Sequence, residues 1–207
     1  AAPAAGGKWP GAGCGVACNT TVKRHTDSNR AAHALHPSGG RRCFRLAQLG
    51  REAANHYHVL VACAKAGAVL VPVNWRLTPN EVDHILRDSG ATLIFVDDEF
   101  WDTVAAVRPQ LRGLRRVIRV DGTDADGEPA RGAGLLAWAA DQPETDPAPG
   151  TGPDDAVIQI YTSGTTGLPK GAILAHRSFF TLPHASRERG VDWIDWLPED
   201  VALISLP

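Results

Sequence analysis

The amino-acid sequence predicts an α/β fold in which a mainly parallel sheet is flanked by helices. The first supporting observation is that short apolar runs rich in β-branched residues alternate with helical patterns from about residue 46 to residue 120. Strands that alternate with helices are joined by right-handed crossovers, which makes the strands parallel and places helices on both faces of the sheet. The second observation is a Gly- and hydroxyl-rich stretch, residues 161–171, that directly follows a further apolar run.

Residues 55–73 predict the first helix and the strand that follows it. Small and apolar side chains lie along one side of residues 55–66, as in a packed helix, and Gly67 supplies the stop. The apolar run 69–73 then predicts a buried strand, in which Pro72 marks an end or an irregularity because it lacks an N–H donor.

The next helix is marked by its ends. Thr78 is a good N-cap, Pro79 suits the first helical position, and Glu81 completes a capping box. Apolar residues follow at helical spacing, and Gly90 ends the segment. Residues 78–90 therefore predict one amphipathic helix.

Two more strands follow that helix. Residues 92–96 predict a second buried strand, and residues 116–120 predict a third. Between them, residues 99–111 predict a helical stretch that Pro109 interrupts. The acidic triplet 97–99 lies at a strand end, where consecutive side chains point apart, so we expect solvated carboxylates there and not a metal site.

An acidic, Pro- and Gly-rich connection, residues 121–155, separates these elements from the Gly- and hydroxyl-rich stretch. A loop of this length is unusual inside a compact domain, so we expect it to lie on the surface. Residues 156–161 then predict a strand that leads into the stretch. Residues 172–176 indicate another strand after it, although their local pattern is also compatible with a helix. Residues 200–206 indicate one more strand.

Residues 1–45 are rich in Ala and Gly and show no sustained period of 2 or 3.6. We therefore expect a disordered or poorly packed segment there, and a folded region that comprises residues 46–207. The cysteines lack metal-site spacing and Cys63 lies in an apolar helical pattern, which favours reduced thiols in the cytoplasm. No apolar run approaches the roughly 18 residues of a membrane span. The absence of methionine and the end of the chain inside a strand-like run indicate a fragment.

Residues 161–171 carry the chemistry of the chain, with five hydroxyl side chains, three glycines and one lysine. Glycines let consecutive N–H groups form a concave anion nest, hydroxyls donate to phosphate oxygens, and the lysine adds a point charge. This composition predicts a polyphosphate site in which the lysine contacts the phosphates directly or anchors the loop. The residues expected to bind the phosphates are Thr162, Ser163, Gly164, Thr165, Thr166, Gly167 and Lys170.

The stretch differs from the Walker loop, because Pro169 and Gly171 flank the lysine where that loop has a glycine and a hydroxyl residue. The string from Tyr161 to Gly171 instead resembles the phosphate-binding signature of the adenylate-forming superfamily. Segments 64–68 and 71–79 are similar to the N-terminal domain of its acyl-CoA synthetases. The resemblance implies that the chain is part of that domain, with a strand–loop–strand hairpin around the phosphates. It also implies a helix before the last strand.

What the resemblance implies is an ATP-dependent acid–CoA ligase of the fatty-acyl-CoA synthetase type. In such enzymes a carboxylic acid and ATP form an acyl-adenylate and pyrophosphate, and coenzyme A then forms the acyl-CoA thioester, with Mg²⁺ as the metal. The similarity covers the first part of the large N-terminal domain, so we expect this fragment alone to be inactive. No nucleic-acid partner is expected.

Two alternatives stay open on the sequence alone. The chain is also compatible with a fragment of an amino-acid or aryl-acid adenylation enzyme, or with a degenerate product that has no function. No catalytic residue is expected within it, because His176 has no carboxylate or nucleophile at a telling spacing. Trp193 and Trp196 are expected to pack in the core more than in an acyl pocket.

Overall fold

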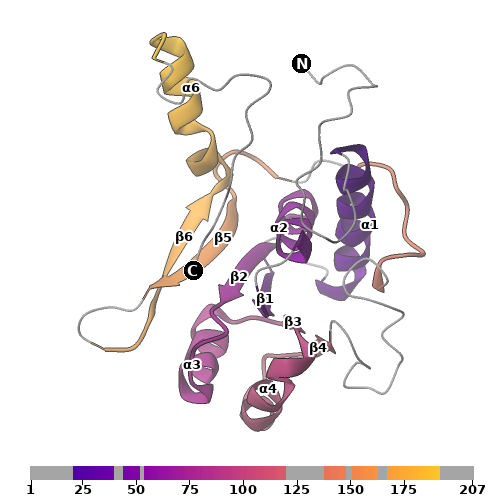
Figure 1. The fold of residues 1–207 in the computed structure, drawn as a ribbon, viewed down its shortest axis with the longest axis vertical. Helices are drawn as coiled ribbons and strands as arrows, with labels where there is room; N and C mark the ends of the chain where they lie inside the picture. The colour runs from indigo at the N-terminus through magenta and orange to yellow at the C-terminus, as the bar shows by residue number, and fades with distance from the viewer. Residues whose placement is uncertain are drawn as a thin grey trace.

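The computed structural model describes residues 21–39, 44–51, 54–119, 138–147, 151–162 and 167–191. These residues form a six-stranded sheet with the order β4-β3-β1-β2-β5-β6 and helices on both faces (Figure 1). The strands are β1 (Arg45–Leu49), β2 (Val69–Val73), β3 (Leu93–Val96), β4 (Arg116–Arg119), β5 (Ala156–Thr162) and β6 (Lys170–Ala175). The α-helices are α1 (Thr21–Gly39), α2 (Ala54–Ala66), α3 (Pro79–Ser89), α4 (Trp101–Val107) and α6 (Thr181–Glu188). The 3-10 helices are η1 (Asp98–Phe100), η2 (Arg108–Gln110) and η3 (His176–Phe179).

Five of these strands run parallel to one another. β1 pairs with β2 on one side and with β3 on the other, β3 pairs with β4, and β2 pairs with β5. Among the described strands only β6 runs antiparallel, as the partner of β5. The predicted α/β class with a mainly parallel sheet is therefore confirmed. Because parallel strands end at the same edge of a sheet, the residues that follow β1, β2 and β5 meet there.

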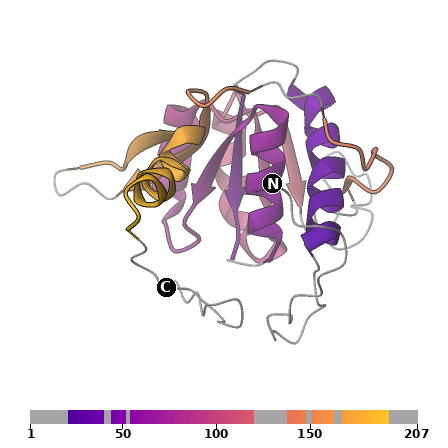
Figure 2. The same ribbon diagram turned by 90° about the horizontal axis from the view of Figure 1, so that it is seen from above.

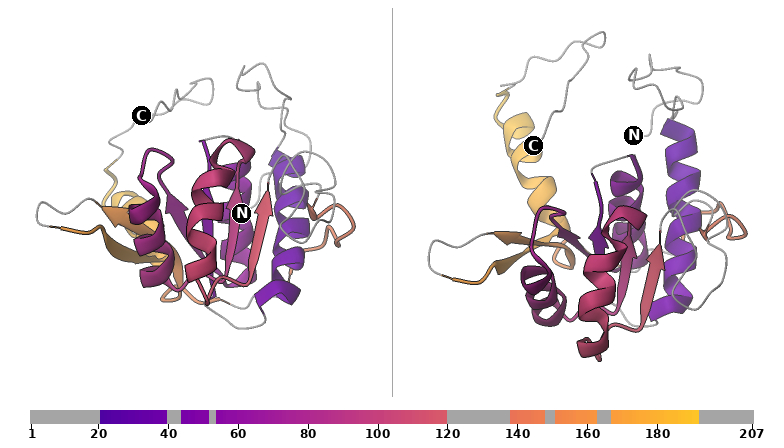
Figure 3. Two further views of the ribbon diagram at one scale, coloured as in Figure 1. Left: turned by 90° about the horizontal axis from the view of Figure 1, so that it is seen from below. Right: turned by 60° about the horizontal axis from the view of Figure 1, so that its bottom comes forward.

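The sheet is the middle layer of three. Helices α1 and α2 lie on one face (Figure 2), and α3 and α4 lie on the other (Figure 3). On the first face, Leu46 and Phe95 belong to the apolar cluster that includes residues of α1 and α2. On the second face, Ile85 of α3 and Val104 of α4 share a cluster with Ile94 of the sheet. The buried core therefore lies on both sides of β1 and β3.

Strand β1 lies inside the sheet, although the sequence predicted no strand here. Leu46, Ala47 and Leu49 are almost fully buried. Arg45 begins the strand half-buried, and Gln48 places a polar side chain in its buried interior. These two polar residues interrupt the apolar run by which the other strands are recognised, which is why the pattern did not indicate this one.

The prediction of disorder for residues 1–45 is wrong where the structure describes them, because α1 occupies most of that part. Helix α1 packs beside α2 and fully buries Ala31 and Leu35. Its buried face consists largely of alanine and of small polar side chains, so the sequence shows no strong apolar period. Residues 1–20 and 40–43 lie outside the described residues.

Helix α3 has the caps that the sequence predicted. The Thr78 hydroxyl accepts a hydrogen bond from the Glu81 N–H, and the Glu81 carboxylate accepts one from the Thr78 N–H at 2.8 Å. The Glu81 carboxylate accepts a second hydrogen bond from the Thr78 hydroxyl at 2.7 Å, and the bonds that it accepts, the backbone one first, lower the pKa of Glu81. Gly90 closes the helix with φ of 66°, a left-handed conformation that suits glycine. Both ends of α3 are therefore fixed, and with them the direction of each side chain along it.

The other predicted elements are confirmed within one to three residues of their expected ends. The helical stretch 99–111 is divided into η1, α4 and η2, and Pro109 lies in η2. Helix α6 contains Pro183 and is short. The strand predicted for residues 200–206 lies outside the described residues, as do Trp193 and Trp196.

The predicted surface connection, residues 121–155, is partly packed. Trp138 meets the ring of Phe95 edge-on, with the two centroids 5.5 Å apart. The backbone carbonyl of Glu144 accepts a hydrogen bond from the Asn29 side chain at 2.6 Å. Exposed residues lie between these two anchors. The described part of the connection therefore covers the sheet beside α1, and only its exposed residues agree with the expectation of a surface loop.

Within the described helices, none combines the length and the apolar character needed to cross a membrane.

Cys63 of α2 is fully buried, as predicted for a small apolar residue, and this burial raises the pKa of its thiol. The other three cysteines lie outside the described residues.

We expect the Thr78→Ala variant to lower the free energy of unfolding by about 1 kcal/mol, because it removes the side-chain acceptor of the N-cap. The Thr78→Ser variant keeps the hydroxyl and is the matched control. Urea denaturation followed by far-UV circular dichroism measures the unfolding of both. Equal stability of the two variants would show that the capping box contributes nothing to the fold.

Candidate functional site

The Gly- and hydroxyl-rich stretch 161–171 joins β5 to β6 as a hairpin at one end of the sheet (Figure 1). Thr162 pairs with Lys170 in the antiparallel register, so residues 163–169 form the loop between the two strands. The predicted strand–loop–strand arrangement is therefore confirmed. Because β5 is parallel to β1 and β2, the loop lies beyond the edge at which these strands end.

The structure describes three of the seven predicted phosphate-binding residues. Thr162 and Lys170 face each other across the hairpin, and both are exposed to solvent. Gly167 lies between them with a φ of 146°, a value that favours glycine. The residues of the set that lie outside the described part of the chain are Ser163, Gly164, Thr165 and Thr166. The described residues thus define where the loop begins and ends.

Gly171 allows two side chains of β5 to cross the hairpin. A Cβ atom at this position would lie 2.5 Å from Nε2 of Gln159 and 2.9 Å from Cζ of Tyr161. Side chains essentially never approach so closely, so these two side chains occupy space that only glycine leaves open. The glycine that ends the stretch is therefore explained by packing across the hairpin.

The hydroxyl of Tyr161 joins the hairpin to α3. It donates a hydrogen bond to Oδ2 of Asp88 at 2.5 Å and accepts one from Nε2 of Gln159 at 3.0 Å. Oε1 of Gln159 in turn accepts a hydrogen bond from Nε of Arg45 at 2.8 Å. Burial, followed by the hydrogen bond and negative charge of Asp88, raises the pKa of Tyr161 above its usual range. The hydroxyl therefore stays protonated and remains a donor at neutral pH.

A cavity of about 470 Å³ opens beside the hairpin, at the edge where the parallel strands end. Residues from the ends of β1 and β2 and from α3 line it, together with Thr162 and Pro169 of the hairpin. Gln48 lines it from β1 and is 8% exposed, and its Oε1 has no hydrogen-bond partner in the part of the chain that the structure describes. A buried acceptor of this kind is stabilised by a donor from a bound molecule or water. In open α/β sheets, ligands bind in the crevice at this edge.

Positive charge lies near this cavity. The indole ring of Trp75 lines the cavity, and the guanidinium groups of Arg51 and Arg76 lie 4.8 and 4.7 Å from its centroid. Cation–π contacts of this length are favourable and hold both cations at the rim. The guanidinium of Arg51 is paired with Glu99, and the Glu81 carboxylate also lines the cavity, so groups of both charges surround it.

The acidic triplet 97–99 does not converge on one point. Glu99 pairs with the guanidinium of Arg51 at 2.6 Å, and the backbone N–H of Arg51 donates to Oδ2 of Asp97 at 2.9 Å. Asp98 pairs with Arg119 at 2.6 Å. Asp97 and Glu99 thus share Arg51 as a partner and Asp98 has another, so the three carboxylates are paired with protein groups and not simply solvated as predicted.

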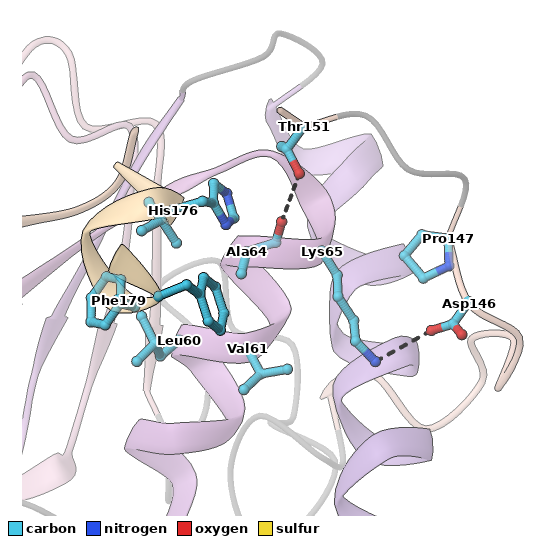
Figure 4. Close-up of a pocket in the computed structure, with 11 residues that line it drawn as sticks. Leu60, Val61, Ala64, Lys65, Asp146, Pro147, Thr151, His176 and Phe179 are labelled. Carbon is cyan, nitrogen blue, oxygen red and sulfur yellow. Dashed lines mark hydrogen bonds and ion pairs between the residues drawn. The ribbon is translucent and has the colours of Figure 1, made fainter. Parts of the chain in front are cut away.

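A second cavity, of about 640 Å³, lies between α2 and η3 (Figure 4). Leu60 of α2 and Phe179 of η3 make its lining largely apolar. Lys65 lies at its side, with Nζ 3.4 Å from Oδ1 of Asp146. Thr151 closes another side through a hydrogen bond to the carbonyl of α2 residue Ala64 at 3.5 Å.

His176 points into this second cavity (Figure 4). Strand β6 separates it from Lys170, and an extended segment of this length spans about 17 Å. A general base must lie within hydrogen-bond reach of the proton that it removes. The structure therefore places His176 beside the second cavity, about one strand length from Lys170.

Asp88 contacts the hairpin, although the sequence assigned it no role. One signal could have indicated it, because Asp88 lies outside the apolar face that Val82, Ile85 and Leu86 form on α3. A polar residue beside such a face can meet a neighbouring strand. Gln159 had no comparable signal, since a single polar residue within a strand does not identify its partner.

A sequence model of the AMP-binding enzyme family matches residues 23–207 of the chain. The match begins inside α1, well before residue 46, where the sequence predicted the folded region to begin. It therefore includes the two elements, α1 and β1, that the sequence pattern did not indicate.

The chain is 47% identical over 189 residues to the fatty acid–acyl-carrier-protein ligase ScoC of Streptomyces coeruleorubidus. The aligned region covers 91% of this chain and 34% of that protein. It is 33% identical over 188 residues to the long-chain-fatty-acid–CoA ligase FadD13 of Mycobacterium tuberculosis. Here the aligned region covers 91% of this chain and 35% of that protein. The chain thus spans about a third of the length of these relatives. The solved structure of the anthranilate CoA ligase AuaEII with anthranoyl-AMP matches with a TM-score of 0.71 at 28% identity, over 82% of this chain and 32% of that one.

We expect Gly171→Ala to lower the free energy of unfolding by about 1–3 kcal/mol, because the new methyl group displaces the side chains of Gln159 and Tyr161. Gly113→Ala is the matched control, since a Cβ at that position meets nothing within 4 Å. Thermal and urea unfolding of the two variants measure the difference. A Gly171→Ala variant as stable as the control would contradict the close packing across the hairpin.

Proposed function

The chain belongs to the AMP-binding enzyme family, and on this premise we propose that it supplies the ATP phosphate-binding loop of an acid–thiol ligase. The observation that carries the proposal is the hairpin of β5 and β6, which presents hydroxyls, glycines and one lysine beyond the edge where the parallel strands end. The relatives named above are ligases that join an acid to CoA or to an acyl-carrier protein, which supports the proposal.

In the proposed site, the loop surrounds the β- and γ-phosphates of ATP. Gly164 and Gly167 let backbone N–H groups converge on the phosphate oxygens. Lys170, exposed at the start of β6, adds a charge-assisted hydrogen bond. The side chains that donate from their hydroxyls are Thr162, Ser163, Thr165 and Thr166.

The proposed reaction has two halves. A carboxylate oxygen of the acid attacks the α-phosphorus of ATP, the bond from that phosphorus to the oxygen of the β-phosphate breaks, and pyrophosphate leaves. A thiol sulfur then attacks the acyl carbon of the adenylate, the bond to the AMP oxygen breaks, and the thiol proton is released. The loop acts in the first half, where its donors stabilise the charge that develops on the leaving pyrophosphate.

A fatty acid is the proposed acid, and coenzyme A is the first candidate for the thiol. An acyl-carrier protein is the second candidate, because the relative at 47% identity is named for that acceptor. An aryl acid is the alternative acid, since the matched structure is that of an anthranilate CoA ligase. Mass spectrometry of the product from the protein that contains this chain distinguishes these cases.

The 207-residue chain alone is proposed to form no acyl-CoA, because it spans about a third of its relatives' length. Mg²⁺ is proposed to enter the site together with ATP. The described residues contain no group of three His, Cys, Asp or Glu side chains arranged to hold a metal ion. The protein is also proposed to be located in the cytoplasm.

We expect Lys170→Ala to weaken the binding of Mg·ATP about 10- to 100-fold, the effect of losing a hydrogen bond to a charged group. Isothermal titration calorimetry of the 207-residue chain measures the dissociation constant. Arg112→Ala is the control, because it removes one positive charge from the loop before β4, at the opposite edge of the sheet.

An unchanged dissociation constant for Lys170→Ala would contradict the role given to the lysine. Absence of Mg·ATP binding by the unchanged chain would contradict the proposed site and favour a product without function.

A further inference from the structure

We infer that His84 and Asp88 of α3 are positioning residues of the phosphate loop, which hold its two ends in the arrangement that binds a nucleotide phosphate. The inference rests on the proposed function of the loop and adds to it a mechanism of preorganisation. Neither residue belongs to the Gly- and hydroxyl-rich stretch.

His84 holds the far end of the loop. Its Nε2 lies 2.9 Å from the backbone carbonyl oxygen of Pro169. A carbonyl only accepts, so Nε2 carries the hydrogen in this contact.

Pro169 is an anchor in an otherwise exposed segment. Its side chain is buried, whereas Gly167, Leu168 and Lys170 around it are exposed. The proline ring also restricts the backbone at this position. With its carbonyl held by His84, Pro169 fixes the backbone immediately before Lys170.

Asp88 holds the near end of the loop. Its Oδ2 accepts the hydrogen bond from the Tyr161 hydroxyl at 2.5 Å. Tyr161 directly precedes Thr162, the first of the proposed phosphate-binding residues. Its ring packs against the core cluster that includes α3, so both the ring and the hydroxyl are held.

One rigid element carries both contacts. His84 and Asp88 are four residues apart and therefore lie one turn apart on the same side of α3. The helix is capped at both ends, and Val82, Ile85 and Leu86 bury its other side against the sheet. The two ends of the loop are thus tied to one body at a fixed separation.

This arrangement affects binding more than folding. A binding segment whose two ends are held loses less conformational freedom when a ligand binds, which strengthens binding without any new contact to the ligand. The hydrogen bond of His84 is only partly buried and that of Asp88 is exposed, so neither bond lies within the fully buried core. Their loss is therefore expected to lower the affinity for nucleotide in a chain that stays folded.

The test is the dissociation constant of Mg·ATP, measured by calorimetry on the 207-residue chain with His84→Phe and Tyr161→Phe. Each variant keeps an aromatic ring. His84→Phe removes the bond to Pro169, and Tyr161→Phe removes the bond to Asp88 together with the one accepted from Gln159. We expect His84→Phe to weaken binding about three- to tenfold, as for the loss of one neutral hydrogen bond, and Tyr161→Phe to weaken it at least as much, because Asp88 is a charged acceptor. His84→Gln, whose amide N–H₂ can still donate to Pro169, is expected to restore the wild-type affinity.

His33→Phe is the matched control, because His33 Nε2 lies 2.9 Å from the backbone carbonyl of Thr145, a contact of equal length away from the loop. We expect it to leave the affinity unchanged and to alter thermal stability as much as His84→Phe does. Wild-type affinity in both His84→Phe and Tyr161→Phe would overturn the inference and leave the proposed function standing. An equal loss in His33→Phe, or no recovery in His84→Gln, would also overturn it. No binding by the unchanged chain would contradict the proposed function and the inference with it.

Discussion

The parallel pairing of β1, β2 and β5 is the constraint on which the rest of the structure depends. Because these strands run in one direction, the residues that follow them come together at one edge of the sheet. There β2 is followed by α3, and β5 turns back as β6. The phosphate loop, the cavity with the unpartnered Gln48 and the helix that supports the loop are neighbours for this reason.

The sequence predicted most accurately the elements whose ends are defined by capping residues close in the chain. Helix α3 was predicted with its bounds because Thr78, Glu81 and Gly90 form caps that depend only on residues nearby. Strand β1 and helix α1 were missed because their burial depends on distant partners. Gln48 lies in the interior of the sheet, and Ala31 lies between two helices, so neither position shows a strong apolar pattern.

The candidate site also has one part that the sequence indicated, the loop, and one part that it did not, the residues that support the loop. The loop residues, from Thr162 to Lys170, are contiguous and carry a chemistry that the sequence displays. Their supports come from elsewhere in the chain, since Asp88 lies 73 residues before Tyr161, and His84 lies 85 residues before Pro169. Such pairs follow from the packing of α3 beside the hairpin, and a single sequence offers no local signal for them. The distance between His176 and the loop likewise follows from the length and direction of β6.

The central claim is that the loop between β5 and β6 binds the phosphates of ATP. Amide hydrogen exchange of the chain, measured by mass spectrometry with and without Mg·ATP, tests this claim most directly. The account predicts slower exchange in peptides that span residues 161–171 and in those of α3, with no change in peptides of α1. Unchanged exchange in residues 161–171, or protection only around the cavity between α2 and η3, would contradict it.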